Sequence, residues 1–376
     1  MSRDGDERPP LVGVDVGGTF TDVVLLADGN VTTVKVPTTE DQSAGVMQGL
    51  TRACSAADIE PTEIETFSHA MTVSVNALLE SAGATTALVT TEGFRDVLEI
   101  GRQDRPELYD LDAEKPTPLV PRQRRFELDE RATVEEVERE VDEREIDALA
   151  DEIAEGEIES VAVCLLHAYA QPENEQRVAE LLRDRLEVPV SASHEVLAEF
   201  REYERTSTTV VDAYVRPPIQ RYLTRLDERA TAAGVPTPRI MQSNGGIADS
   251  STVRERAVTT VLSGPAAGVI SADAVETDRE GLITFDMGGT SSDVSLLGEG
   301  GAEITTDAEI DGRPIGTPMV DIHTVGAGGG SIGWVDAGGA LRVGPQSAGA
   351  TPGPAAYGCG GTEPTVTDAN VVLGYM

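Results

Sequence analysis

The chain has 376 residues and carries 66 acidic against 29 basic side chains, a formal net charge of −37. Such a surface repels nucleic-acid phosphates, and no basic stripe is present to bind them, so we expect no nucleic-acid partner. The length suffices for two or three domains, and 39% hydrophobic residues support a packed core.

Lysine is almost absent, since Lys35 and Lys115 are the two lysines of the sequence. Dispersed acid with so little lysine resembles proteins of salt-accumulating organisms, where ions screen the repulsion between like charges. An acidic protein that works at ordinary salt is the alternative.

Compartment is indicated by cysteine usage and by the absence of long apolar runs. The three cysteines (Cys54, Cys164 and Cys359) form no CxxC pair, which is typical of a reducing compartment. Residues 1–10 are polar, and no uncharged apolar run reaches 18 residues. We therefore expect a cytoplasmic protein with no signal peptide and no membrane span.

A nine-residue motif occurs near the start of the chain and again near residue 290. Residues 15–23 read Asp-Val-Gly-Gly-Thr-Phe-Thr-Asp-Val, and residues 286–294 read Asp-Met-Gly-Gly-Thr-Ser-Ser-Asp-Val. Each copy lies between two short apolar runs, which are Leu11–Val14 and Val23–Leu26 for the first and Leu282–Phe285 and Val294–Leu297 for the second. The pattern predicts a strand, a Gly-Gly turn and a second strand, twice over.

The chemistry of this motif suits a nucleotide phosphate. Paired glycines let backbone N–H groups approach an anion, and nearby hydroxyls add hydrogen bonds. The candidate phosphate ligands are Gly17, Gly18, Thr19, Thr21, Gly288, Gly289, Thr290 and Ser292. Asp15 and Asp286 end the first strand of each copy, and a carboxylate beside phosphate implies Mg²⁺ held partly through water. Two ordinary hairpins with turn-capping aspartates are the alternative, which the duplication disfavours.

Further elements follow the first hairpin. The sequence predicts a strand over Val31–Val36, a helix from Thr39 or Asp41 to Cys54, and a helix over Val73–Leu79. A strand over Ala84–Thr91 and a helix beginning within Gly93–Ile100 come next. His69, in a segment expected to follow a strand end, is a ligand for substrate or metal or else a structural hydrogen bonder.

Six arginines gather in an irregular region: Arg102, Arg105, Arg122, Arg124, Arg125 and Arg131. They face an anionic substrate or partner, or they balance neighbouring acids in a solvated loop. Apolar spacing over Thr133–Glu155 predicts one or two amphipathic helices.

Strands and helices alternate beyond this point, which predicts an α/β protein. We expect a strand over Val161–Leu166, a helix over Pro172–Leu186, a strand over Val188–Ser191, and a helical stretch over Glu199–Ala233 interrupted at Pro217-Pro218. A lobe boundary near residue 200 gives a first lobe of residues 1–200 and a second of 201–376.

The second lobe contains three small-residue or polar features. Residues 263–268 have the composition of a helix N-terminus, which binds an anion or simply allows close packing. Asp321 and His323 share a strand face by spacing, which leaves a metal site open. Residues 328–333 match GxGxxG formally, a weak signal by itself, and no GxxxxGK[ST] motif is present.

The two hairpin motifs resemble the phosphate-1 and phosphate-2 loops of the actin–hexokinase ATPase superfamily. More narrowly, the chain resembles the hydantoinase A / 5-oxoprolinase / acetone carboxylase β-subunit family. The likeness rests on the motifs and on residues 86–97, 99–103, 243–246, 263–268, 323–331 and 364–370. Where that family usually has Gly-Thr, this chain has Ala70-Met71, which puts a ligand contact of this loop in doubt.

This resemblance implies an α/β, two-lobed actin/hexokinase-like (ribonuclease H-like) ATPase fold with an incomplete second lobe. Residues 15–22 and 286–293 would face each other across ATP, with Asp15 and Asp286 positioning Mg²⁺ and the glycines and hydroxyls holding phosphates. Asp22 and Asp293 would organise the hairpins. Members of the family extend past residue 376, so we expect a fragment, a split gene whose remainder is a separate chain, or a remnant.

The activity implied is ATP-dependent opening of a cyclic amide or imide such as hydantoin or 5-oxoproline. ATP would activate the carbonyl oxygen by phosphorylation, together with a second, hydantoinase B-type subunit. A β-type subunit of a ketone carboxylase and a non-catalytic nucleotide-binding remnant are the alternatives.

Overall fold

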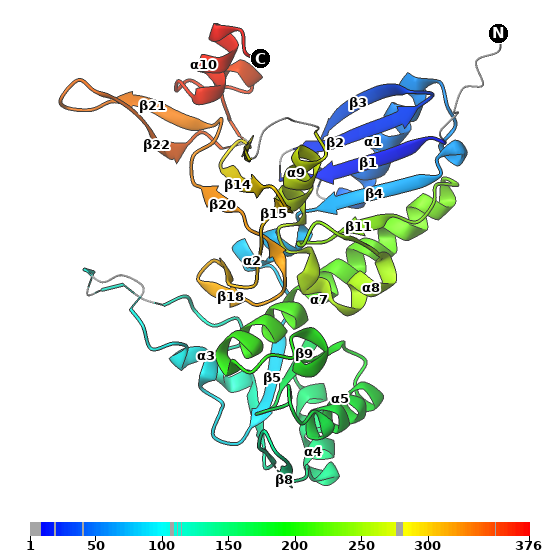
Figure 1. The fold of residues 1–376 in the computed structure, drawn as a ribbon, viewed down its shortest axis with the longest axis vertical. Helices are drawn as coiled ribbons and strands as arrows, with labels where there is room; N and C mark the ends of the chain where they lie inside the picture. Colours follow the sequence, from blue (N-terminus) through cyan, green and yellow to red (C-terminus); the bar gives the residue numbers. More distant parts are fainter. Residues whose placement is uncertain are drawn as a thin grey trace. The chain divides into compact units, whose positions relative to one another are not determined.

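The computed structural model describes residues 9–18, 20–39, 41–105, 109–110, 112–113, 115–275, 281–349 and 351–376 (Figure 1). Tertiary contacts divide the chain into two units. The first is Met1–Gly264 with Thr306–Met319, and the second is Pro265–Thr305 with Val320–Met376. These units do not divide at residue 200, because the helix that follows it, α7 (Glu202–Ala232), packs on the strands of the first unit.

A six-stranded sheet carries the first glycine hairpin. Its order is β12-β11-β4-β1-β2-β3, with β4 parallel to both β1 and β11 and the other neighbours antiparallel. The strands are β1 Leu11–Val16, β2 Phe20–Ala27, β3 Asn30–Pro37, β4 Thr66–Met71, β11 Arg239–Met241 and β12 Ile247–Asp249. Alternate residues of β1 point into one hydrophobic core, which accounts for the period-two pattern of its sequence.

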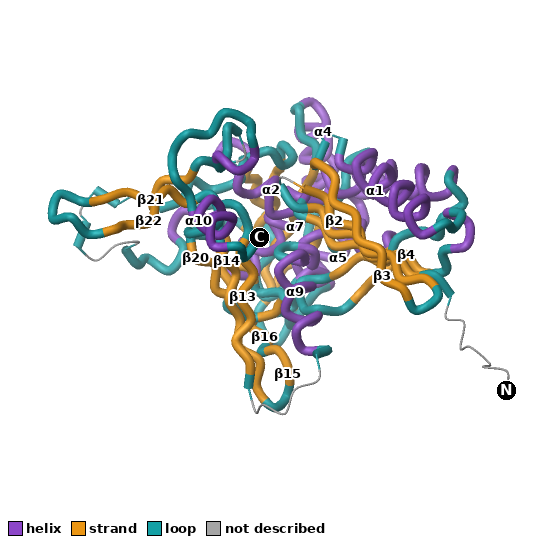
Figure 2. The backbone as a smooth tube through the Cα atoms, turned by 90° about the horizontal axis from the view of Figure 1, so that it is seen from above, coloured by secondary structure: helices purple, strands orange, loops and turns teal. Residues whose placement is uncertain are grey.

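Helices cover this sheet. Helix α1 packs on β2 and β3, as Figure 2 shows from above, and it also contacts α7. The helices are α1 Gln42–Ala57, α2 Val73–Leu79, α7 and α8 Ser250–Glu255. The strand predicted at Val31–Val36 and the helices predicted from Asp41 and at Val73–Leu79 are confirmed.

A second, fully parallel sheet has the order β10-β9-β5-β6. Its strands are β5 Thr86–Thr91, β6 Arg125–Leu128, β9 Ser160–Cys164 and β10 Val190–Ala192. Its helices are α3 Val97–Ile100, α4 Glu143–Glu155, α5 Glu173–Arg185 and α6 Ser193–Val196. Every residue of β5 and of β9 is buried, as expected for parallel strands covered on both faces.

Two helix predictions were wrong in part. Helix α7 runs unbroken through Pro217 and Pro218, because residues before and after them, such as Val215 and Ile219, are buried in the same core. Burial on both sides compensates for the backbone hydrogen bonds that proline removes. In the 133–155 stretch the helix begins only at Glu143, and β7 (Arg131–Ala132) and β8 (Val137–Arg139) form a short hairpin before it.

The hairpin of β7 and β8 has a local cause. The hydroxyl of Thr133 accepts hydrogen bonds from the backbone N–H groups of Glu135 and Glu136, which closes a turn. Asp142 then caps α4 by accepting from the N–H of Arg144 over 2.9 Å. A turn and a cap within one periodic stretch explain the shorter helix.

The remaining elements are small. The first unit also contains the hairpin of β17 (Ala308–Ile310) and β18 (Arg313–Ile315). The second unit holds most of α9 (Ser263–Asp273), and its sheet is built from β13 Leu282–Met287, β14 Ser292–Gly298, β15 Gly301–Ala302 and β20 His323–Val325. The remaining elements are β16 Ile304–Thr305, β19 Met319–Val320, β21 Ser331–Val335, β22 Leu341–Ser347 and α10 Val366–Leu373. The α/β class is confirmed, and both predicted Gly-Gly hairpins are present.

Candidate functional site

The first glycine pair closes a tight turn between β1 and β2. The N–H of Gly17 donates to the carbonyl of Phe20 over 2.9 Å. The hydroxyl of Thr38 donates to the Gly17 carbonyl, also over 2.9 Å, and fixes the turn from the neighbouring strand. Asp15 and Gly18 are exposed at this end of the sheet, so both can reach a ligand.

The second glycine pair repeats this geometry between β13 and β14. The N–H of Gly288 donates to the carbonyl of Ser291 over 2.9 Å. Asp286 lies opposite Asp293 in the ladder, as Asp15 lies opposite Asp22 in the first. The second tip is also open, since its aspartate, both glycines and Thr290 are exposed.

Two of the predicted hydroxyl ligands point inward. Thr21 is fully buried, with its hydroxyl 3.3 Å from that of Thr38. Ser292, at the matching ladder position, is also buried and donates to the Ala327 carbonyl over 2.6 Å. Both side chains hold their hairpin to an adjacent segment. Thr19, another predicted ligand, lies outside the described residues.

A glycine-rich segment, residues 326–330, supports the second hairpin from within its own unit. The N–H groups of Gly329 and Gly330 donate to the carbonyls of Gly288 and Gly289 over 2.8 and 2.6 Å. A Cβ added to Gly328 would lie 2.7 Å from the Gly288 carbonyl oxygen, so this approach requires glycine. The GxGxxG pattern of residues 328–333 is used here for backbone packing.

The segment after residue 363 completes this arrangement. The N–H of Thr367, in the first turn of α10, donates to the Gly329 carbonyl over 2.8 Å. Thr365 and Asp368 form a capping box that fixes the start of this helix. Sequence reasoning marked both segments as part of the family pattern but did not connect them with the second hairpin.

The outer aspartate of each hairpin binds the neighbouring strand. Lys35 on β3 forms an ion pair with Asp22 at 2.6 Å. Thr324 on β20 donates to Asp293 over 2.7 Å, while burial raises the pKa of the Asp293 carboxyl. These contacts assign both side chains to holding the sheet together.

Within each unit a glycine lies close to the inner aspartate. Within the first unit, a Cβ added to Gly264 would lie 3.5 Å from Oδ1 of Asp15, and Ser263 anchors this end by donating to the Met71 carbonyl over 3.0 Å. Within the second unit, a Cβ added to Gly268 would lie 3.5 Å from Oδ2 of Asp286.

His69 is structural. It lies within β4, not in a loop, and is 1% exposed. Its Nδ1 is 3.1 Å from the Val14 carbonyl oxygen and its Nε2 is 2.7 Å from the Tyr222 hydroxyl, so both ring nitrogens are used. Burial lowers the pKa of His69 to about 4. His323 is exposed on β20.

Three of the six clustered arginines pair with acids. Arg102 forms two hydrogen bonds with Glu204 at 2.7 Å, Arg122 pairs with Asp96 at 2.9 Å, and Arg125 pairs with Glu99 at 2.7 Å. This favours charge balance as the role of these three side chains, but Arg125 is buried at the start of β6 and does not lie in a solvated loop.

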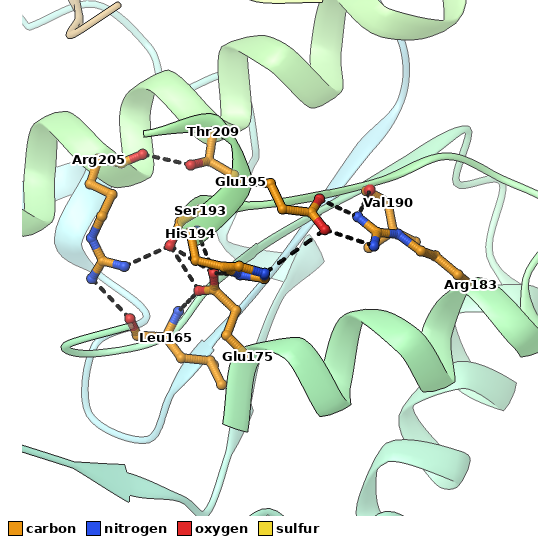
Figure 3. A network of polar contacts seen from close by, with 9 residues as sticks. All are labelled: Leu165, Glu175, Arg183, Val190, Ser193, His194, Glu195, Arg205 and Thr209. Atoms are coloured by element: carbon orange, nitrogen blue, oxygen red, sulfur yellow. Dashed lines mark hydrogen bonds and ion pairs between the residues drawn. The ribbon is translucent and has the colours of Figure 1, made fainter. Parts of the chain in front are cut away.

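A buried polar network joins β9, α5, α6 and α7 in the first unit (Figure 3). Glu175, fully buried, accepts from the N–H of Leu165 and from both the N–H and the ring Nδ1 of His194, each at 2.7 Å. Arg205, also fully buried, donates to the Leu165 carbonyl over 2.8 Å and to the Ser193 hydroxyl over 2.6 Å. The Glu175 carboxylate is occupied by donors from the chain itself, so the network holds elements together.

The residues of the two hairpins fit a magnesium ion that binds together with a nucleotide. No group of three or more His, Cys, Asp or Glu side chains suited to a metal occurs among the described residues. Mg²⁺ bound to a nucleotide takes one or two carboxylates, and phosphates and waters fill its other positions. Single exposed carboxylates at Asp15 and Asp286 therefore fit an ion delivered with phosphate.

In the part of the chain that the structure describes, no helix has the length and apolarity to cross a membrane.

The comparison with known proteins places these hairpins in a family. Residues 11–186 match the family described as Hydantoinase/oxoprolinase N-terminal region, and residues 205–376 match Hydantoinase/oxoprolinase. The chain is 42% identical to caprolactamase subunit alpha of Pseudomonas jessenii over 97% of its own length and 54% of that protein. It is 33% identical to 5-oxoprolinase of Saccharomyces cerevisiae over 97% of its length and 32% of that protein.

Solved structures agree with this assignment. The crystal structure of the ATP-dependent caprolactamase from Pseudomonas jessenii matches with a TM-score of 0.83 and 39% identity, covering 97% of this chain and 55% of that one. Nucleotide-free acetone carboxylase matches with a TM-score of 0.81 and 26% identity, covering 98% and 55%. The chain thus spans about a third to just over half of the proteins it resembles. The actin/hexokinase-like fold expected from the motifs is confirmed, and the chain belongs to the hydantoinase/oxoprolinase family.

Proposed function

We propose that this chain is the ATP-binding part of an enzyme that opens a cyclic amide or imide. The observation that carries this proposal is the duplicated hairpin. Two Gly-Gly turns have the same ladder pairing, and each has an exposed aspartate at the end of its first strand. A nucleotide with several phosphates would use two such turns, because each turn can bind a different phosphate.

The assignment of residues follows their exposure. Gly18 and Gly289 offer backbone N–H groups to the phosphates, while Gly17 and Gly288 use theirs to close the turns. Thr290 offers an exposed hydroxyl, and Thr19 remains a candidate from the sequence. Asp15 and Asp286 would hold Mg²⁺, which supplies charge neutralisation of the phosphates when bound. Thr21 and Ser292, which are buried, act by keeping the turns in place.

The chemical step uses ATP as a substrate. Its terminal phosphoryl group would pass to the amide carbonyl oxygen and release ADP. One water would then attack the activated carbon as the ring C–N bond breaks, and a second water would release the phosphate and leave the free carboxylate. The aspartates and glycines of this chain bind and orient the phosphates, and a second, hydantoinase B-type subunit would contribute to the later steps. Relatives named caprolactamase and 5-oxoprolinase support this class of substrate.

A carboxylase subunit is the second candidate. The similarity to acetone carboxylase favours it, because in that reaction a ketone takes the place of the cyclic amide.

The acid-rich, lysine-poor composition supports a protein of a salt-rich cytoplasm.

Calorimetric titration with Mg·ATP tests the site. Asp15→Asn and Asp286→Asn should each weaken Mg·ATP binding by roughly tenfold or more, because each removes one carboxylate ligand of the ion. Their melting temperatures should stay within a few degrees of wild type, since both positions are exposed. Lost stability with unchanged binding would assign the aspartates to structure and overturn the proposal.

A second measurement separates the two activities. ADP release is followed in the presence of a hydantoinase B-type subunit, with hydantoin, 5-oxoproline or caprolactam in one series and acetone with bicarbonate in the other. Stimulation by a ring supports the hydrolase, and stimulation by the ketone with bicarbonate supports the carboxylase. If neither series raises ADP release above the level without substrate, the chain binds nucleotide and has neither activity.

A further inference from the structure

Strands β13, β14 and β20 of the second unit lie side by side (Figure 2) and form a sheet with one covered face. On that face Leu282 and Leu297 pack with residues of α9 such as Val269. On the opposite face, Ile283 and Leu296 point the same way, because directly opposed residues of an antiparallel pair share a face. Five apolar side chains there are exposed, and we call them the open face: Ile283, Phe285, Met287, Leu296 and Val325.

The first unit shows how the equivalent face is covered. The open-face residues of β13 occupy the ladder positions that Val12, Val14 and Val16 occupy on β1. Those valines are buried in a core with residues of α1, the helix that follows the third strand, β3. A Cβ added to Gly49 of α1 would lie 2.7 Å from a methyl group of Val23 on β2, so the helix lies directly on the sheet. A helix therefore covers in the first unit the face that is open in the second.

The two sheets also correspond in their third strand. Val325 of β20 is opposite Ser292, as Val36 of β3 is opposite Thr21. In the first unit the chain continues from β3 through α1 and returns as β4, which pairs with β1 in parallel. Among the described residues of the second unit, no strand after β20 pairs with β13, since β21 and β22 pair with each other. Helix α1 and strand β4 therefore have no counterpart on this sheet in the described part of the chain.

The edge of β13 is not protected against further pairing. Exposed edge strands in native proteins often carry Lys or Pro, which discourage the addition of another strand. Strand β13 reads Leu-Ile-Thr-Phe-Asp-Met, with Asp286 as its charged residue and neither Lys nor Pro. His323 is an exposed polar neighbour of the open face, opposite Val294 on β14. An apolar face beside an unprotected edge indicates a surface that another polypeptide covers.

We propose that the open face and the free edge of β13 bind a polypeptide segment that forms a helix followed by a strand. The helix would lie on the open face as α1 lies on the first sheet, and the strand would run parallel to β13 as β4 runs parallel to β1. An amphipathic helix about as long as α1, which has 16 residues, fits this surface. The residue beside Asp286 would be small and uncharged, as Ala70 is beside Asp15.

The relatives indicate where such a segment comes from. The chain covers 54% of caprolactamase subunit alpha of Pseudomonas jessenii and 55% of the chain in the caprolactamase crystal structure. Nearly half of that subunit therefore has no counterpart here, and it is long enough to supply a helix and a strand. The polypeptide that corresponds to this remainder is the occupant. The inference concerns the sheet and stands apart from the proposed function, since it needs no nucleotide.

The test uses the full chain, coproduced with the part of caprolactamase subunit alpha that follows the matched region. Dissociation of the complex is followed by sedimentation velocity over a dilution series. Phe285→Asp and Ile283→Asp each place a charge on the open face. Val31→Asp is the matched control, because Val31 is a comparably exposed residue of β3 in the first unit. The matched region of caprolactamase subunit alpha, coproduced with the same remainder, shows that the probe is competent to bind.

Each open-face variant should weaken the complex at least about tenfold, since a buried aspartate replaces an apolar contact. Val31→Asp should leave the affinity unchanged. Hydrogen exchange should slow at least about tenfold for the β13 amides that point away from β14, because the added strand accepts their hydrogen bonds. The melting temperatures of the free variants should stay within a few degrees of wild type, since both side chains are exposed.

Four results would overturn the inference. An affinity unchanged in both open-face variants would place the occupant elsewhere on the chain. Weakened binding without slower exchange in β13 would mean that the face is covered and no strand is added. Failure of wild type to bind a remainder that binds its own subunit would assign the face to a different partner. Self-association of wild type that Phe285→Asp abolishes, without binding of the remainder, would assign it to a second copy.

Discussion

The two hairpins have the same backbone pairing and opposite surroundings. Alternate side chains of β1 are buried, with Val12, Val14 and Val16 at 2%, 3% and 0% exposure. The matching residues of β13 are Ile283, Phe285 and Met287, and they are 71%, 61% and 43% exposed. Each set lies at the same positions relative to the glycine pair, so this face of the hairpin is covered in the first unit and exposed in the second. In the second unit Leu282 and Leu297, on the other face, pack into a small core.

The surroundings differ because the strands hold different places in their sheets. Strand β1 lies between β4 and β2, and its buried face packs into the large core that includes α1 and α7. Strand β13 is at the edge of its sheet in the part of the chain that the structure describes. The second hairpin has a smaller core, which includes Leu297, and it also receives backbone hydrogen bonds from Gly329 and Gly330. The same local sequence can therefore be stabilised by a core or by a close backbone contact.

Charge also differs between the hairpins. Lys35 neutralises the outer aspartate of the first, whereas the outer aspartate of the second receives only a hydrogen bond from Thr324. Asp286 adds a like charge that further raises the pKa of Asp293. The second hairpin is thus the more dependent on cations from outside the chain.

Salt should have the largest effect, because it acts on all of the negative charge in both units. The Debye length falls from roughly 30 Å at 0.01 M to about 3 Å at 1 M salt, so molar salt screens most of the repulsion. We expect the melting temperature to rise strongly between 0.05 M and 2 M NaCl, with the second hairpin gaining protection from hydrogen exchange as well. Identical melting curves at the two concentrations would contradict the interpretation of the composition as halophilic.

A matched pair of leucines tests the contrast in burial. Leu25 on β2 is fully buried opposite Val12, and Leu296 on β14 is 58% exposed opposite Ile283. Leu25→Ala should cost about 2–5 kcal/mol of unfolding free energy, and Leu296→Ala less than about 0.5 kcal/mol. Denaturant unfolding in 2 M salt measures both. Equal losses would mean that Leu296 is buried as fully as Leu25.

The hairpins could be predicted from sequence because their determinants are local. A glycine pair between two short apolar runs specifies the turn, the strands and the place of Asp15 and Asp286. The inward direction of Thr21 and Ser292 could not be predicted, since it depends on Thr38 and on the Ala327 carbonyl, which are remote in sequence.

Other features depended on tertiary packing. The passage of α7 through Pro217-Pro218 follows from burial on both sides of the prolines, and the use of Gly328 follows from its distance to Gly288.

His69 gives a smaller, pH-dependent effect that belongs to the first hairpin. Burial lowers its pKa from 6.5 to about 4, so the folded protein keeps the ring neutral while the unfolded chain takes up a proton. The stability is fully present above pH 6.5 and decreases as pH falls toward 4, by about 3 kcal/mol at most. Because many carboxylates titrate in this range, the informative quantity is the difference in unfolding free energy between wild type and His69→Gln.

That difference should shrink between pH 7.5 and pH 4.5 in 2 M salt, since glutamine does not titrate. A difference that stays constant with pH would mean that folding does not change the pKa of His69.

The smallest expected effect concerns the backbone contact that holds the second hairpin. In Gly328→Ala the new Cβ would meet the Gly288 carbonyl oxygen at 2.7 Å and the Ser291 nitrogen at 2.8 Å, both backbone atoms that cannot rotate away. We expect a cost of about 1–3 kcal/mol, faster hydrogen exchange in β13 and β14, and weaker Mg·ATP binding, because the turn that carries Gly288 must shift. Gly326→Ala is the matched control, since no atom lies within 4 Å of a Cβ there. Exchange in β1 and β2 should be unchanged in both variants. If Gly328→Ala left the exchange of the second hairpin at its wild-type rate, the hairpin would hold its shape without the glycine segment, and the difference between the two hairpins would lie in burial alone.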